Sequence, residues 1–168
     1  MTFLLGLILS TAQAFDMGYN INIEDYNKNN KWYKKPDIMI CKDAIIKKED
    51  LKIAIDAWEK EGIKVGKIVN EKSKECDDDY EKGYILIMAE RDLIAGTSHH
   101  AITQRWYLGE NNGKRNVVSA YIEIKSMTVW VRPDDMPALL THELGHAFGY
   151  KHVESNNDIM HPGILSRY

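Results

Sequence analysis

Residues 142–152 read His-Glu-Leu-Gly-His-Ala-Phe-Gly-Tyr-Lys-His, and this stretch carries most of the chemical information in the chain. His142 and His146 are four residues apart, which places both imidazoles on one face of a helix, near enough to share a metal ion. Glu143 follows the first histidine, and its carboxylate would project beside that metal and could take a proton from a bound water. The spacing therefore predicts a helix with a metal site on one face.

Two further positions extend this pattern beyond the helix. Gly149 is expected to end the helix, because glycine readily adopts the left-handed conformation that turns the chain sharply. The chain can then return so that His152 reaches the metal from a third direction. Three neutral nitrogen ligands leave one position of Zn²⁺ open, as a catalytic site requires. The whole pattern arises by chance on the order of 10⁻⁵ times in such a chain at typical residue frequencies.

The motif resembles the zinc-binding signature of the metzincin clan of zinc metallopeptidases. The resemblance implies a methionine in a tight turn beneath the metal, and Met160 follows His152 at that place. It also implies that Pro162 helps to wall the pocket for the residue after the scissile bond. The layout looks most like small bacterial matrixin-type domains. Val153 after the third histidine and the lack of a tyrosine two positions after Met160 leave the branch unassigned.

The remaining patterns predict one α/β (α+β) domain. Apolar runs and period-two alternation indicate strands over 37–41, 63–69, 84–89, 101–107 and 119–124. Helical spacing of apolar residues indicates helices over 49–61 and 134–148. We expect a turn over 109–113 and an irregular lead-in over 15–36. The resemblance implies a twisted mixed sheet of four to five strands, a backing helix, an active-site helix and a minimal C-terminal subdomain. Within it, 101–107 would be an antiparallel edge strand. Ala101, Ile102 and Thr103 would then line the substrate site, where the strand pairs with an extended peptide.

Composition limits the classes of partner. The chain has 168 residues, 44% of them hydrophobic, with 22 basic and 25 acidic side chains, for a formal net charge of −3. That balance gives no electrostatic reason to bind nucleic acid. Residues 1–14 form an apolar run that ends in Ala-Gln-Ala and predict a secretory signal peptide, despite the missing basic residue, with a buried N-terminal element as the alternative. Cleavage near Ala14-Phe15 would leave 15–168 as a secreted or periplasmic monomer without a stable membrane anchor.

The cysteines and two adjacent histidines leave alternatives open. In an oxidising compartment, Cys41 and Cys76 could form a disulfide, and two buried free thiols are the other interpretation. The resemblance to matrixins suggests the hypothesis of a second, structural zinc ion bound by His99 and His100. No matching aspartate is evident, so we expect one catalytic Zn²⁺ and solvated loop histidines near the cleft.

The sequence thus predicts a zinc-dependent endopeptidase that acts on peptide or protein substrates, with Glu143 as general base toward a zinc-bound water and His142, His146 and His152 as ligands. Two other functions fit the same residues. One is a non-catalytic secreted zinc protein that binds a partner, and the other is a zinc amidase that cleaves a non-protein polymer. Chelator-sensitive cleavage of peptides distinguishes the first function from these two.

Overall fold

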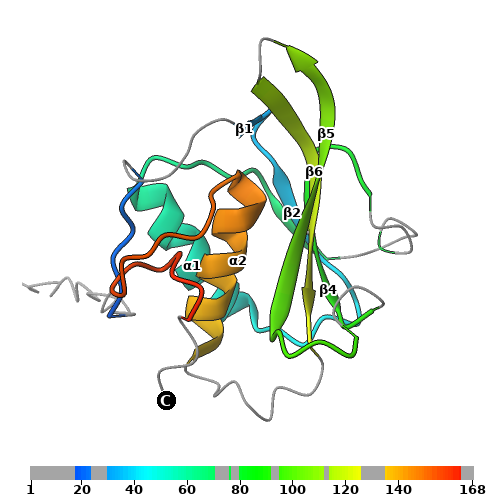
Figure 1. Cartoon of the computed structure of the whole chain (residues 1–168). Helices are drawn as coiled ribbons and strands as arrows, with labels where there is room; N and C mark the ends of the chain where they lie inside the picture. The colour runs from blue at the N-terminus through cyan, green and yellow to red at the C-terminus, as the bar shows by residue number, and fades with distance from the viewer. Residues whose placement is uncertain are drawn as a thin grey trace, which may run out of the picture.

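The computed structural model describes residues 18–23, 30–70, 76, 80–91, 95–111, 114–125 and 135–163. The predicted signal peptide over 1–14 lies outside the described residues. In the part of the chain that is described, two helices pack on one face of a six-stranded mixed sheet (Figure 1). The elements follow one another as β1 (Asn30–Trp32), β2 (Asp37–Ile40), α1 (Lys48–Lys60), β3 (Ile68–Asn70), β4 (Tyr84–Ala89), β5 (Ala101–Asn111), β6 (Lys114–Ile124) and α2 (Met136–Phe148).

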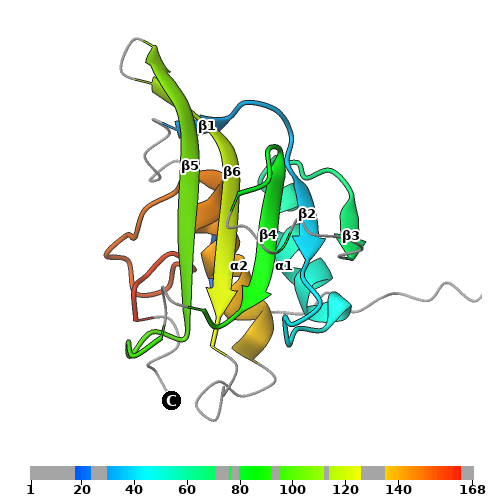
Figure 2. The ribbon, with the colours of Figure 1, turned by 90° about the vertical axis from the view of Figure 1, so that its right-hand side faces the viewer.

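Most strands of the sheet run parallel. The linear order is β1-β6-β4-β2-β3, and each of its four neighbouring pairs is parallel. β5 is not part of this linear order. It pairs with β6 in the antiparallel direction (Figure 2). The predicted mixed α/β class with two helices is therefore confirmed.

Several details of the prediction were wrong. The sheet has six strands rather than four to five, because β1 forms within the segment that was expected to be an irregular lead-in. The strand predicted over 63–69 is confined to Ile68–Asn70. The strand predicted over 101–107 as an antiparallel edge strand belongs to β5. β5 lies outside the linear order, which ends at β1 and β3, and its pairings among the described residues are all antiparallel ones with β6.

The hairpin between β5 and β6 is longer than its sequence suggested. β5 extends to Asn111 and β6 begins at Lys114, so most of the turn predicted over 109–113 belongs to strand. The register between the strands shifts near Trp106 and near Leu108. These irregularities break the period-two pattern, which explains why the sequence indicated two short strands and a wide turn.

Alternating side chains give the sheet two apolar faces. Ile85 and Ile87 of β4 face the helices, whereas Leu86 and Met88 face the other side, and all four are fully buried. β4 lies between β2 and β6 and is therefore a central strand buried on both faces. The second face holds the disulfide that joins Cys41 and Cys76.

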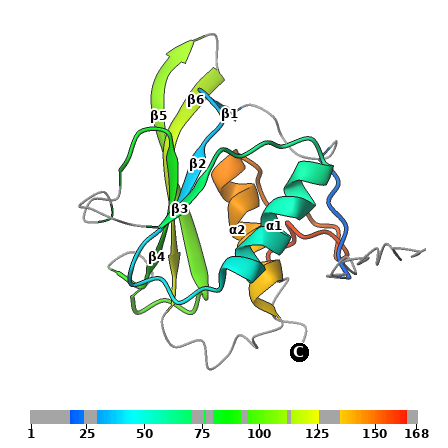
Figure 3. The ribbon, with the colours of Figure 1, turned by 180° about the vertical axis from the view of Figure 1, so that it is seen from behind.

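The helices are fixed to each other and to the sheet by two tryptophans. The indole of Trp58 on α1 donates a hydrogen bond to the Thr141 carbonyl of α2 at 2.8 Å. The indole of Trp32 on β1 donates to the Ala147 carbonyl near the end of α2, also at 2.8 Å. The view from behind shows α1 in front of α2, with the sheet to one side of both helices (Figure 3). The two tryptophans thus attach α2 to α1 and to β1.

Candidate metal centre

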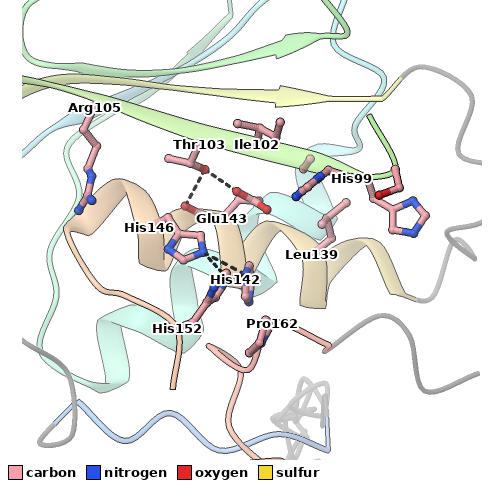
Figure 4. A pocket seen from close by; sticks show the side chains of 13 residues that line it. His99, Ile102, Thr103, Arg105, Leu139, His142, Glu143, His146, His152 and Pro162 are labelled. Atoms are coloured by element: carbon pink, nitrogen blue, oxygen red, sulfur yellow. Dashed lines mark hydrogen bonds between the residues drawn. The ribbon is translucent and has the colours of Figure 1, made fainter. Parts of the chain in front are cut away.

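Three histidine side chains converge beside helix α2. His142 and His146 lie on α2, and His152 follows in the segment that returns after it (Figure 4). The Nε2 atoms are separated by 3.1 Å for His142 and His146, 3.2 Å for His142 and His152, and 3.0 Å for His146 and His152. A tetrahedral ion bound at about 2.0–2.1 Å from each nitrogen holds its ligands about 3.3–3.4 Å apart. The three histidines therefore lie close enough to hold one metal ion.

Hydrogen bonds to the Nδ1 atoms show which ring nitrogen of His142 and of His146 carries the proton and which has a free lone pair. Nδ1 of His142 lies 2.7 Å from the carbonyl oxygen of Ile159, and Nδ1 of His146 lies 2.9 Å from that of Tyr150. A carbonyl oxygen can only accept, so each Nδ1 carries the proton. In a neutral imidazole the Nε2 atom then has an unprotonated lone pair. Three Nε2 lone pairs this close together repel one another. A cation bound between them would remove this repulsion, because all three lone pairs would coordinate it. The three histidines therefore fit a metal ion.

Burial favours the neutral state that a metal ligand needs. Burial lowers the pKa of His142 to about 4, although the Ile159 carbonyl opposes the shift. It lowers the pKa of His146 to about 3, and the positive charges of His142 and Arg105 add to the effect. The pKa of His152 is also lowered, chiefly by burial. The ligand set is therefore ready to bind a cation at neutral pH without first losing protons.

Glu143 lies beside the three histidines and is almost completely buried, with 5% of its surface exposed. Burial raises its pKa to about 7, and the hydrogen bond from Thr103 opposes that shift. The Thr103 hydroxyl lies 2.5 Å from Oε2 of Glu143 and 3.2 Å from the Glu143 carbonyl. Strand β5 thus holds the carboxylate of α2 in place. The sequence analysis predicted Thr103 only as a substrate-pocket residue and did not predict its hydrogen bond to Glu143.

The end of α2 directs the third histidine toward the other two. Gly149 adopts a φ of 109°, the left-handed conformation predicted from the sequence, and its N–H donates to the His146 carbonyl. Asp135 occupies the N-cap position, but its side chain makes no capping hydrogen bond. Beyond the helix, the Val153 N–H donates to the Met160 carbonyl at 3.1 Å. This bond fixes the strand of chain that carries His152 onto the turn that carries Met160.

Met160 is fully buried and packs against the backbone of α2. A Cβ atom built on Gly145 would lie 2.3 Å from the Met160 sulfur and 2.7 Å from Cζ2 of Trp58. Real side chains do not approach so closely, so the contact requires glycine at position 145. Sequence reasoning missed this role, because a glycine inside a predicted helix gives no sign of what packs on it.

Asp158 is a second buried residue that sequence reasoning missed. Its carboxylate accepts from the Met160 N–H at 2.7 Å and from the Asn22 N–H at 3.3 Å. Asn20 pairs with the same loop through bonds to the Asn157 carbonyl and from the Ile159 N–H, both at 2.8 Å. Figure 3 shows this early segment beside the chain that follows α2. An acidic residue two positions before the predicted methionine was the only available signal.

The centre opens into a cleft of roughly 570 Å³. Its lining includes every predicted substrate-pocket candidate, together with the metal ligands and Glu143: Ser98, His99, His100, Ala101, Ile102, Thr103, Arg105, Leu139, His142, Glu143, His146, His152 and Pro162. His99, which precedes β5, lies toward one end of this cleft, whereas Arg105 lies at the other (Figure 4). Sequence reasoning did not single out Arg105.

Trp106 and Tyr107, two aromatic residues of β5, are not part of the cleft lining. Trp106 is 39% exposed and contacts the ring of Tyr80, with the ring planes nearly perpendicular. The Tyr107 ring contacts the guanidinium groups of Arg105 and Arg115, whose carbons lie 5.7 and 5.9 Å from the ring centre.

Comparison with known proteins supplies no assignment, since no protein-family model matches the chain and no curated protein is similar to it. The structure adds two coarse facts. Within the described ranges no helix is both long and apolar enough to cross a bilayer. The Cys41–Cys76 disulfide is a feature common in exported proteins.

Proposed function

We propose that this protein is a secreted zinc-dependent endopeptidase of the metzincin type. The observation that carries the proposal is the triangle of three histidine Nε2 atoms, 3.0 to 3.2 Å apart, with the buried Glu143 carboxylate beside it in an open cleft. Three neutral imidazoles suit zinc among several transition metals, and three protein ligands leave a position free for catalysis. When bound, zinc would supply Lewis acidity that activates water and polarises the scissile carbonyl.

Glu143 is the proposed general base and, later, the general acid. Its pKa of about 7 in the metal-free protein lies near the pH of use, which favours proton transfer in both directions. The carboxylate takes a proton from the attacking water and then gives it to the nitrogen of the leaving amine. Thr103 donates to Oε2 and so fixes the orientation of the carboxylate during both transfers.

The backbone of β5 is the proposed peptide-binding strand. All pairings found for β5 in the described chain are with β6, which leaves the opposite backbone edge for an extended peptide. Its first residues, Ala101 to Thr103, line the cleft beside the metal ligands. In the same proposal, Pro162 borders the pocket for the residue after the scissile bond, and Met160 forms the apolar base beneath the ligands.

The proposed setting is outside the cytoplasm. The predicted signal peptide over 1–14 and the disulfide both support export. The exported chain would act as a monomer with one zinc ion.

Incubation of the zinc-loaded protein with a randomised peptide library tests the function, with cleavage followed by mass spectrometry. We expect internal cleavage that a chelator abolishes and that added zinc restores. The matched control is Glu143→Gln, which should keep stoichiometric zinc and lose about 10²- to 10⁴-fold in rate, since both proton transfers depend on the carboxylate. Intact peptides in the presence of bound zinc would instead indicate a binding protein, and cleavage of cell-wall amides alone would indicate an amidase.

A further inference from the structure

Arg105 lines the cleft, and no ion pair joins it to another of the described residues. Its side chain leaves β5 on the same face as Thr103, two residues earlier, and reaches toward the end of α2 that carries His146 (Figure 4). Cross-strand pairing supports this direction, because Arg105 lies opposite Ala120 and Thr103 opposite Ile122, and both partners face the helices. Arg105 is the only Lys or Arg side chain that lines the cleft as described.

The guanidinium of Arg105 has an unsatisfied donor. Its Nη1 atom is buried, yet it has no hydrogen-bond acceptor among the described residues. No carboxylate of the described chain forms an ion pair with it either. Buried polar atoms without partners are rare in folded proteins, and a buried charged donor is more costly than a neutral one. The guanidinium therefore keeps an unsatisfied donor, which a carboxylate bound in the cleft would satisfy once the side chain turns toward it.

Two neighbours explain why the side chain stays directed into the cleft. The Tyr107 ring lies 5.7 Å from the guanidinium carbon and holds it by a cation–π contact. Glu143 is the only Asp or Glu among the described residues that line the cleft, and its carboxylate accepts from the Thr103 hydroxyl rather than from Arg105. Arg105 is thus oriented by Tyr107 and forms no ion pair with a described residue.

We propose that Arg105 is a specificity-determining residue that binds a carboxylate of the substrate peptide within about two residues of the scissile bond. This inference rests on the proposed peptidase function. A strand advances about 6–7 Å over two residues, so a peptide that runs along β5 past Thr103 and Glu143 presents a nearby side chain to Arg105. The planar guanidinium matches a carboxylate with two parallel hydrogen bonds. The carboxylate belongs either to an Asp or Glu side chain or to the C-terminus of a short peptide.

The test uses two randomised peptide libraries that differ only in replacing Asp and Glu by Asn and Gln, each made with a free and with an amidated C-terminus. Cleavage by the zinc-loaded protein is compared for the native chain, Arg105→Gln and Arg105→Lys. Arg115→Gln is the matched control, because Arg115 also contacts Tyr107 but lies outside the cleft lining. Zinc content and circular dichroism verify that each variant is folded.

We expect the native chain to favour acidic peptides about 10- to 100-fold in kcat/KM, the range of a charge-assisted hydrogen bond. Arg105→Gln should abolish the preference, Arg105→Lys should retain part of it, and Arg115→Gln should leave it unchanged. A preference that depends on the free C-terminus, and not on Asp or Glu, would assign the carboxylate to the chain end. Equal cleavage of all libraries, or a preference that survives in Arg105→Gln, overturns the proposal while the peptidase function stands.

A binding measurement separates this proposal from the proposed function. Zinc-loaded Glu143→Gln protein is immobilised, and peptides retained from the same libraries are identified by mass spectrometry. Enrichment of acidic peptides that disappears in the Glu143→Gln, Arg105→Gln double variant supports the carboxylate site even if the native chain cleaves nothing. Retention without enrichment contradicts the carboxylate site, and no retention together with no cleavage rejects both proposals.

Discussion

The Nδ1 atom of His142 donates to the carbonyl oxygen of Ile159 across 2.7 Å, so the residue before Met160 sets the orientation of the first metal ligand. The same turn is held by Asp158, whose carboxylate accepts from the Met160 N–H and from Asn22. Groups behind a metal-binding histidine fix both its tautomer and its ring orientation. The early segment around Asn22 therefore supports the metal centre, although it lies far from it in sequence.

Asp158→Asn should weaken zinc binding about 10-fold, the lower end of the range for groups that orient metal ligands. The two carboxylate oxygens of Asp158 accept hydrogen bonds from the backbone N–H groups of Asn22 and Met160. The asparagine amide has only one oxygen, so its NH₂ group would face one of these two donors and lose that hydrogen bond. Competition with a chromogenic chelator measures the affinity. Asp56→Asn is the control, because Asp56 forms only a surface ion pair with Lys52 on α1. Equal affinity in both variants would mean that the turn holds its shape without the carboxylate.

Gly145→Ala should destabilise the protein by about 1–3 kcal/mol, the usual cost of overpacking. In an ordinary helix this substitution is favourable by up to about 1 kcal/mol, so the sign of the change tests the contact. The new methyl group would overlap the Met160 sulfur and the Trp58 ring. Urea unfolding of the metal-free protein measures the effect. Combination with Met160→Ala should cost less than the sum of the single changes, and strict additivity would contradict the predicted overlap.

Joint replacement of Cys41 and Cys76 by alanine should lower the free energy of unfolding by about 3–4 kcal/mol, since the bridge closes a loop of 35 residues. Zinc affinity should stay within about threefold of the native value. The bridge packs with Met39, Leu86 and Met88 on the sheet face away from the helices, whereas the metal ligands belong to the helix face. Urea unfolding and chelator competition on one preparation measure both quantities. A large loss of zinc affinity would show that the two faces are coupled.

The sequence predicted the helix α2 and the convergence of His142, His146 and His152, because helix periodicity and ligand spacing are both local properties. The stop at Gly149 and the buried strand β4 follow from the same local rules. What it could not predict depends on contacts between distant segments. β1 is three residues long and forms through its pairing with β6, and Asp158 acquires its role from Asn22. The importance of Arg105 is visible only after β5 has been placed beside α2.

The buried Glu143 should make the stability of the metal-free protein fall as pH rises. Its pKa is about 7 in the folded state against a usual 4.5, so between these values the folded chain holds a proton that the unfolded chain has released. The free energy of unfolding contributed by this residue therefore decreases from pH 4.5 through 7 and is constant above.

Glu143→Gln removes this dependence but keeps the side-chain shape. The variant should gain up to about 3 kcal/mol over the native chain at pH 8, and nearly nothing at pH 4.5. Urea unfolding in chelator across this range measures the difference, with Glu154→Gln at an exposed position as control. A constant difference between the two proteins at all pH values would contradict the buried, protonated carboxyl.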